Sequence, residues 1–409
     1  MTNNRNARFN RKETQMHPVA KRLNLLIEEL SEMFPERRKV IEAVIIAILA
    51  KQHFFALGPP GTGKTALFTN IFKAIVGARH FEALLSKNLP SEAILGPYSL
   101  KQMRENDLLV HQINGYLPAV EFGTLDEMGK MSPSVGHDLL PILNERKLHQ
   151  VDPVAGTSFI DIPLYTVGGA SNEVPTDGDN TDAEAFWDRI PVRVVVDYIQ
   201  ETANWLKMLH GDITDPVNTV DWADLKQVID VDVPAILFTT AVDDRLVTLR
   251  DAIRSSDLVV GDRRWKQMVP LLKASAFLAG RGTVEVGDIA VLRHVLWEDP
   301  ADIATVERLT IGVADPLARK ALDQLDLVEE VAQEVRDAKG LAAEKKAGLT
   351  VELNARLAVI ATDVAAILTE AEGKGSSTTK IKEVQDRVKA VQRSVFADLM
   401  NMDPTLLNI

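Results

Sequence analysis

Residues 58–65 read Gly58-Pro59-Pro60-Gly61-Thr62-Gly63-Lys64-Thr65, and the apolar run Phe54-Phe55-Ala56-Leu57 stands directly before them. This octamer fills every position of the pattern G-x-x-x-x-G-K-[ST], whose glycines let backbone N–H groups turn toward a phosphate at the start of a helix. Lys64 is then expected to reach the β- and γ-phosphates, and the Thr65 hydroxyl to bind Mg²⁺. The stretch therefore predicts a phosphate-binding loop between a strand and a helix.

The residues that follow the octamer have the pattern of an amphipathic helix. Residues 66–76 contain neither proline nor glycine, and Gly77 could end such a helix. Apolar residues recur there at helical spacing, at Phe68, Ile71, Phe72 and Ile75. The alternative for the octamer alone is a plain Gly-Pro turn that binds nothing, and the flanking strand and helix favour the phosphate site.

An acidic pair follows a second apolar stretch. Residues 120–125 predict a strand, and Leu125-Asp126-Glu127 would close it at the carboxyl edge of a parallel sheet, beside the phosphate site. Asp126 is expected to hold Mg²⁺ through its water shell, and Glu127 to polarise the water that attacks the γ-phosphate. An Asp-Glu pair often merely ends a strand, so this interpretation depends on the octamer that precedes it.

One amide and a set of arginines stand where they could act on a γ-phosphate. Asn172 follows a strand predicted over 162–168, although an asparagine also commonly opens a loop. Arg189 precedes the last predicted strand, and Arg263 with its neighbour Arg264 opens a later helix. Fixed positive charge stabilises the charge that develops on a transferred phosphoryl group, and an arginine from a neighbouring subunit makes hydrolysis depend on assembly. Without the other motifs, each of these arginines would be interpreted as a surface salt-bridge residue.

Composition indicates a folded protein and excludes several kinds of site. The chain has 409 residues, of which 46% are hydrophobic, enough for two or three domains. Its formal charge of −12 argues against a general binder of nucleic acid or anionic membranes. Cysteine is absent, which excludes disulfides, thiolate catalysis and zinc–thiolate sites and fits a cytoplasmic protein. The most apolar stretch, residues 40–50, is too short for a membrane span and predicts a buried helix.

The spacing of apolar residues divides most of the chain into three parts. Residues 1–16 are a basic arm without apolar periodicity, which we expect to be disordered and solvated, with binding of nucleic acid or an acidic partner as the alternative. Residues 17–197 begin with helices over 17–34 and 35–50 and then alternate strands with helices, as in an α/β domain whose parallel sheet has helices on both faces. Residues 198–310 predict a small helical lid domain.

A C-terminal three-helix region is predicted over residues 311–409. Apolar residues step by three and four along three segments, which Gly340, Gly348 and the stretch 373–377 separate. A three-helix bundle or a helical hairpin stalk fits this pattern. Such a region could oligomerise, dock a partner or brace the lid, and apolar stripes do not separate these roles.

The motifs taken in order resemble those of AAA+ ATPases, and within them the MoxR family and its RavA branch. The resemblance covers residues 17–310 and rests on the order of the motifs more than on any one of them. Besides the octamer and Leu-Asp-Glu, the sequence pieces that carry it stand at residues 96–100, 114–118, 143–146, 169–173, 188–189 and 262–265.

The resemblance implies a role for each predicted site residue. Lys64 and Thr65 look like the Walker A residues, and Asp126 and Glu127 like Walker B. Asn172 looks like sensor 1. Arg189 looks like an arginine finger that acts in trans, and Arg263 like the sensor 2 arginine, with Arg264 as a close alternative. Residues 96–118 would correspond to the helix-2 insert that faces the pore of the ring.

The family likeness also implies an activity and partners. It implies an ATPase that uses ATP and Mg²⁺, forms a homo-oligomeric ring, expected to be a hexamer, and remodels a client protein beside a partner with a von Willebrand factor A domain. The chain departs from the pattern in two places. Residues 122–125 are less apolar than a usual Walker B strand, and we see no segment for the small β-domain of the RavA tail.

Two other functions remain open at the level of sequence. A nucleic-acid motor on the same ring would need basic residues in the insert, but Lys101, Arg104 and His111 are balanced there by Glu105 and Asp107. A nucleotide-gated scaffold would turn ATP over slowly and use the C-terminal helices to recruit its client.

Overall fold

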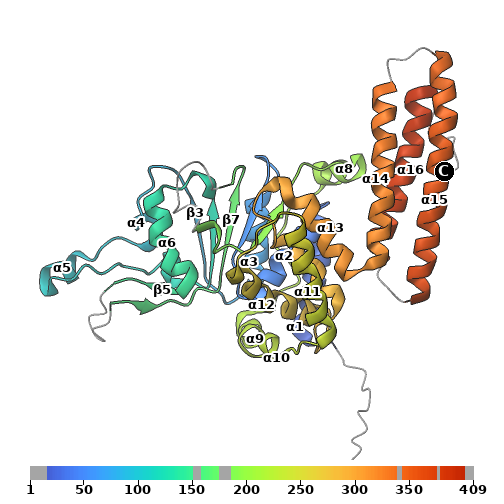
Figure 1. The fold of residues 1–409 in the computed structure, drawn as a ribbon. Helices are drawn as coiled ribbons and strands as arrows, with labels where there is room; N and C mark the ends of the chain where they lie inside the picture. Colours follow the sequence, from blue (N-terminus) through green and yellow to red (C-terminus); the bar gives the residue numbers. More distant parts are fainter. Residues whose placement is uncertain (1–15, 151–157, 175–185, 339–342, 375–377, 401–409) are drawn as a thin grey trace, which may run out of the picture. The chain divides into compact units, whose positions relative to one another are not determined.

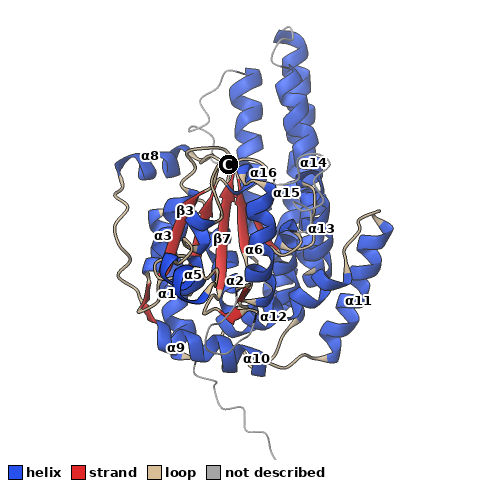
Figure 2. Cartoon of the chain, turned by 90° about the vertical axis from the view of Figure 1, so that its left-hand side faces the viewer, coloured by secondary structure: helices blue, strands red, loops and turns tan. Residues whose placement is uncertain are grey.

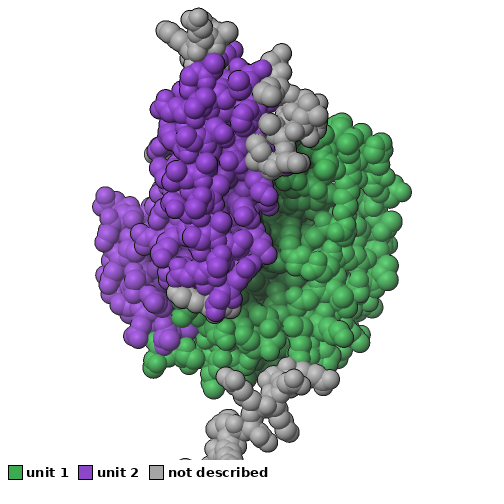
Figure 3. Space-filling view, turned by 90° about the vertical axis from the view of Figure 1, so that its right-hand side faces the viewer, with its two compact units in different colours: residues 1–240, 260–296 green, residues 241–259, 297–409 purple. Residues whose placement is uncertain are grey.

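The computed structural model describes residues 16–150, 158–174, 186–338, 343–374 and 378–400. The chain divides into two compact units, residues 1–240 with 260–296 and residues 241–259 with 297–409 (Figure 3). The basic arm predicted over 1–16 lies, except for Met16, outside the described residues. The domain boundaries predicted from the sequence remain predictions.

A five-stranded parallel sheet forms the centre of the first unit (Figure 2). Its order is β3-β4-β7-β1-β8, so β1, the strand before the octamer, lies between β7 and β8. The strands are β1 Phe54–Leu57, β3 His80–Leu84, β4 Phe122–Asp126, β7 Thr166–Ser171 and β8 Val192–Val195. Because all of them are parallel, the octamer, the acidic pair and Asn172 follow strands that end at the same edge of the sheet.

Glycines let the central strands pack closely against large side chains. A Cβ on Gly168 would lie 2.4 Å from Cζ of Phe54, and a Cβ on Gly169 would lie 2.6 Å from Cε of Met128. In β4, a Cβ on Gly123 would lie 2.5 Å from Cδ1 of Leu117. The glycine in β4 therefore leaves room for the Leu117 side chain, and the predicted strand forms although it is less apolar than usual.

Helices cover both faces of the sheet. In Figure 1, α6 lies on one side of the strands, and α2 and α3 lie on the other. The helices of this unit are α1 Pro18–Met33, α2 Arg38–Leu49, α3 Lys64–Lys73, α4 Glu92–Leu95, α5 Leu100–Asn106, α6 Pro133–Glu145, α8 Thr202–His210, α9 Trp222–Gln227, α10 Val233–Ala235 and α12 Asp262–Leu278. Short helical turns lie at η1 Leu117–Ala119, η2 Met128–Lys130, η3 Val228–Asp232 and η4 Val286–His294, and short strand pairs join β2 Ile75–Val76 to β9 Val220–Asp221 and β5 Lys147–Leu148 to β6 Ile160–Asp161.

Three predicted elements are displaced in the structure. The helix predicted over 35–50 begins at Arg38, because Glu36 has a left-handed φ of 62° that a helix cannot contain. The helix after the octamer ends at Lys73, because Ile75 and Val76 pair with β9 instead of continuing it.

The strand predicted over 162–168 also lies further along the chain. Its ladder runs over Thr166–Ser171, because Pro163 lacks an N–H for the ladder and the small residues at 168–171 are the ones that fit between β4 and β1. The apolar pattern of the sequence placed this strand too early.

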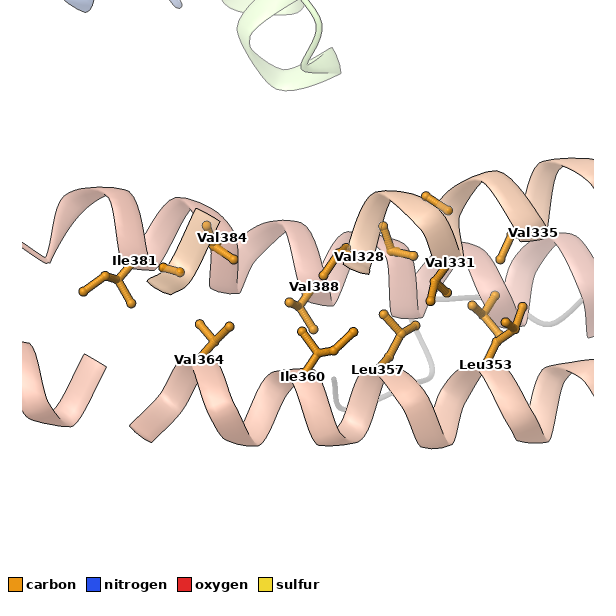
Figure 4. Close-up of a cluster of buried hydrophobic side chains, with 14 of the residues drawn as sticks. Val328, Val331, Val335, Leu353, Leu357, Ile360, Val364, Ile381, Val384 and Val388 are labelled. Carbon is orange, nitrogen blue, oxygen red and sulfur yellow. The ribbon is translucent and has the colours of Figure 1, made fainter. Parts of the chain in front are cut away.

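The second unit contains a three-helix bundle, as the sequence predicted. Its helical elements are α11 Thr240–Ser255, whose first residue belongs to the other unit, η5 Pro300–Asp302, α13 Ile303–Ala314, α14 Pro316–Asp337, α15 Ala343–Lys374 and α16 Thr379–Met400. Side chains from α14, α15 and α16 interdigitate in one apolar core (Figure 4), which includes Val328, Val331, Leu357, Ile360, Val384 and Val388. The apolar stripes of the sequence are therefore the inside of this bundle.

Within the part of the chain that the structure describes, none of the helices combines the length and apolar character that a bilayer crossing requires.

Buried histidines make the stability of the first unit depend on pH. Burial lowers the pKa of His294 to about 3 and that of His80 to about 4, and the pKa of His53 lies well below its usual value. Above about pH 6.5 these groups are neutral in both the folded and the unfolded chain. Below it only the unfolded chain takes up their protons, so the free energy of unfolding falls by about 1.4 kcal/mol per pH unit for each histidine.

Urea unfolding at pH 7.5, 6.5 and 5.5 measures this dependence, in a window above the titration of the carboxylates. We expect the urea midpoint to fall between pH 6.5 and pH 5.5. His80→Gln removes one of the titrating groups, so the midpoint of this variant should fall less over the same range. An unchanged midpoint at pH 5.5 would contradict the prediction.

Candidate nucleotide site at the carboxyl edge of the sheet

The phosphate loop, residues 58–65, has the backbone of an anion-binding turn. Gly61 and Gly63 have φ values of 77° and 80°, and both face open space where a Cβ would stand. Gly63 caps helix α3, so the positive end of this helix points into the loop. Gly58 begins the loop tightly, because a Cβ there would lie 2.0 Å from the carbonyl oxygen of Val196.

The Lys64 ammonium is held at the mouth of the loop. Its Nζ donates hydrogen bonds to the carbonyl oxygens of Gly58 at 2.8 Å and of Pro59 at 2.9 Å. Burial lowers the pKa of Lys64, and the charges of Asp126 and Glu127 oppose this shift. A partly buried cation beside open N–H groups fits a phosphate chain.

Thr65 and Asp126 converge as a pair of hard oxygen ligands. The Thr65 hydroxyl donates to Oδ2 of Asp126 at 2.7 Å, and the N–H of Glu127 donates to Oδ1 of Asp126 at 2.8 Å. Among the described residues no group of three or more acidic, histidine or cysteine side chains gathers around a possible metal. One hydroxyl and one carboxylate beside a phosphate loop are instead what Mg²⁺ needs when phosphate oxygens and water complete its shell, so these residues fit Mg²⁺ with a nucleotide.

Glu127 stands at a sharp turn directly after β4. Its φ of 54° is left-handed, and Nζ of Lys130 lies 3.1 Å from Oε2 of Glu127. The next residue but one, Gly129, donates its N–H to the Ser171 hydroxyl at 3.2 Å, and a Cβ on Gly129 would lie 2.8 Å from that oxygen. The turn that carries Glu127 is therefore bonded to the end of β7.

Asn172 directly follows that bonded end of β7 and is exposed. Ser171 is buried, and its hydroxyl also accepts the N–H of Glu173 at 3.3 Å. The structure thus places Asn172 on the loop beside the turn of Glu127, at the same sheet edge as the phosphate loop. Residues 175–185, which follow shortly after Asn172, lie outside the described residues.

The predicted arginines gather around Asp188. Arg263 donates to Oδ2 of Asp188 at 3.1 Å, and Arg264 lies 3.5 Å from Oδ1 of the same carboxylate. Burial lowers the pKa of Arg189, and the nearby charge of Arg263 adds to this shift while Asp188 opposes it. Arg189 lines a cavity of about 620 Å³ together with residues of α4 and α6. Among the described residues, none from the phosphate loop lines this cavity.

Exposure separates the two candidates for the sensor 2 role. The Arg264 side chain is 1% exposed, whereas that of Arg263 is 47% exposed and therefore accessible to a ligand. We therefore expect Arg264→Ala to lower the free energy of unfolding by at least about 2 kcal/mol. Arg263→Ala should change it by less than about 0.5 kcal/mol and lower ATP turnover by about 10-fold or more.

Thermal unfolding and steady-state ATPase rates of the two variants test this assignment. A loss of turnover without a loss of stability in Arg264→Ala would instead make Arg264 the sensor.

A second cavity, of about 690 Å³, opens directly beside the phosphate loop. Gly61, Thr62 and Gly63 form one part of its lining, and residues of the segments 32–37 and 198–213 form the rest. The sequence interpretation assigned no site residue to either segment. The signal it overlooked is the apolar run of α8, which contains Trp205, Leu206 and Leu209 and follows a strand that ends at the carboxyl edge.

Comparison with known protein families agrees with this geometry. The model of the MoxR domain in MoxR-vWA-beta-propeller ternary systems matches residues 21–220, and that of an AAA lid domain matches residues 241–310. The chain belongs to the MoxR family of AAA+ ATPases. The MoxR match spans the phosphate loop, the acidic pair and Arg189, while the lid match includes Arg263. The likeness to the RavA branch remains a prediction.

Two uncharacterized proteins are similar to this chain over most of its length. An uncharacterized protein of Methanocaldococcus jannaschii is 31% identical over 377 residues, which cover 90% of this chain and 95% of the relative. A second uncharacterized protein of the same organism is 31% identical over 321 residues, or 77% of this chain and 82% of the relative.

A solved structure supports the fold. The crystal structure of a candidate ATPase from Cytophaga hutchinsonii aligns with a TM-score of 0.54 at 15% identity, over 72% of this chain and 93% of that one. At this identity the likeness shows the AAA+ fold alone.

Proposed function

We propose that the protein is an ATP-hydrolysing, ring-forming chaperone that remodels or assembles a protein partner. The observation that carries the proposal is the convergence of Lys64, Thr65, Asp126 and Glu127 at one sheet edge, with Thr65 bonded to Asp126 at 2.7 Å. This is the set of side chains that phosphoryl transfer to water requires.

Each residue then has a task on the triphosphate. The loop N–H groups and Lys64 bind the β- and γ-phosphates, and Thr65 and Asp126 hold Mg²⁺. When bound, Mg²⁺ neutralises charge on the phosphate oxygens. Glu127 orients the attacking water, Asn172 positions it against the γ-phosphate, and Arg263 contacts that phosphate from within the chain.

Arg189 is proposed to act on the nucleotide of a neighbouring subunit. It lines the cavity beside α4 and α6 and not the one beside its own phosphate loop, which supports a role in trans. Hydrolysis then depends on assembly, which we propose to be a hexameric ring in the cytoplasm.

The partners are proposed to be proteins. The matched family model belongs to systems that pair MoxR with a von Willebrand factor A domain, which supports such a domain as partner. The insert at residues 96–118 exposes Leu100 by 63% and Leu109 by 56%, surfaces that suit contact with a client protein better than with a phosphate backbone. The RavA branch, with its helical tail, is the proposed placement within the family.

The ATPase rate per subunit against protein concentration, together with the mass in solution with and without ATP, tests the proposal. We expect the rate per subunit to rise as the mass rises. Turnover that is independent of assembly would point to a self-contained NTPase or a nucleotide-gated scaffold. DNA or RNA that stimulates hydrolysis in a salt-sensitive way would favour the nucleic-acid motor.

A further inference from the structure

Helix α8, Thr202–His210, is tied down by polar contacts while its apolar side chains are left uncovered. No residue of this helix is buried. Trp205 is 46% exposed, Met208 43% and Leu209 55%. A short helix without a buried face gains little stability from apolar packing. Its position therefore depends on its polar contacts with neighbouring residues.

The ties come from the corner between α1 and α2. The Glu36 carboxylate accepts the backbone N–H groups of Gln200 and Glu201, each at 2.9 Å, and the side-chain amide of Asn204 at 3.0 Å. These bonds lower the pKa of Glu36 against the opposing effect of burial, so the carboxylate stays charged at neutral pH. At the other end, Lys207 pairs with Glu32. Glu36 therefore fixes the position of the start of α8.

Helix α8 forms part of the wall of the cavity of about 690 Å³ beside the phosphate loop. Trp205 and Met208 line it from α8, Phe34 lines it from the facing corner, and Gly61 and Thr62 close its phosphate end. A ligand whose phosphates lie in the loop would thus extend its other end between apolar walls. Flat aromatic rings gain most from such walls, because they can stack on an indole face.

We propose that Trp205 stacks on the base of the bound nucleoside triphosphate and sets much of its affinity, with Glu36 as the positioning residue for α8. The proposal rests on the proposed function, since it assumes that the loop holds a triphosphate. Stacking uses the π-face that every base has, so Trp205 contributes similarly to ATP and GTP binding and contributes nothing to a phosphate chain without a base.

Calorimetric titration with ATP, GTP and inorganic tripolyphosphate, each with Mg²⁺, tests the proposal on the full chain. Trp205→Ala should weaken ATP and GTP binding by about 5- to 100-fold and leave tripolyphosphate binding unchanged. Trp205→Phe should keep most of the affinity, because a smaller aromatic ring still stacks. Leu206→Ala is the matched control, since Leu206 is the next residue, is 43% exposed and is not part of the cavity lining.

Two further measurements separate stacking from a merely structural effect. Nucleotide should quench part of the emission of the five tryptophans, and this quenching should disappear in Trp205→Phe while binding persists. Glu36→Gln, which keeps the shape but removes the charge, should weaken ATP more than tripolyphosphate.

The possible results are distinct. Trp205→Ala that binds ATP as the wild type does, or that loses tripolyphosphate and ATP equally, would overturn the role of Trp205. A wild type that binds ATP no more tightly than tripolyphosphate would overturn it too, and would leave the proposed function intact. A wild type that binds no nucleotide would overturn the proposed function and this inference with it.

Discussion

Replacing Arg189 with alanine is expected to lower ATP turnover by about 10³-fold or more and to leave the binding of ATP to each subunit nearly unchanged. The reason is that Arg189 lines a cavity other than the one beside its own phosphate loop, so we expect its guanidinium to act on a neighbour's γ-phosphate in the ring. An arginine supplied in trans acts on charge that develops only in the transition state, and the ground-state complex does not need it.

Steady-state turnover and equilibrium binding of nucleotide, measured above the concentration at which the protein assembles, check this prediction. Arg250→Ala is a suitable control, because Arg250 lies on α11 with its side chain 47% exposed. Assembly should be followed in parallel by mass, so that a variant that fails to form the ring is not mistaken for one that forms it and is inactive.

Mixing two inactive variants gives a sharper result. A subunit with Arg189→Ala keeps its own Glu127, and a subunit with Glu127→Gln keeps its own Arg189. In a mixed ring some interfaces combine an intact Glu127 with an intact Arg189, so part of the activity should return. If mixing restores nothing while mixed rings form, the arginine does not act in trans.

The change Glu127→Gln is expected to lower turnover by about 10²- to 10⁴-fold while ATP still binds. Glutamine has the size of glutamate, so the left-handed turn and its bond to Ser171 should persist. What disappears is the negative charge that orients and polarises the attacking water. Bound nucleotide should then remain as ATP, which chromatography of the released nucleotide measures.

Lys64→Ala provides the contrast for Glu127→Gln. Lys64 supplies the cation at the mouth of the loop, so its loss should weaken binding itself as well as turnover. Equal loss of binding in both variants would show that Glu127 is part of the binding site and not of the hydrolytic step. Normal turnover in Lys64→Ala would remove the basis for an ATPase of this kind.

The parts of the site that lie next to one another in the sequence could be predicted well. Residues 58–65 form a local unit whose glycine conformations follow from the residues themselves, and the structure has Gly61 and Gly63 in the expected positive φ region. The three-helix core could be predicted for a similar reason, because the spacing of apolar residues decides which face of each helix is buried.

Features that depend on distant residues were predicted poorly. The limits of β7 follow from the fit of Gly168 against Phe54, which no local pattern reveals. Nor does the sequence separate Arg263 from Arg264, since both have the same chemistry and only packing buries one of them. Trp205 was overlooked because its value depends on Glu36, a residue more than a hundred positions earlier in the chain.

Ser171 has a consequence for how the site responds to its ligand. Its carbonyl oxygen accepts the N–H of Gly58, which begins the phosphate loop, and its hydroxyl accepts the N–H groups of Gly129 and Glu173. One small residue thus connects, through hydrogen bonds, three loops at the carboxyl edge of the sheet. Because the three loops share one hydrogen-bonding residue, a shift of one of them should strain the hydrogen bonds that hold the other two.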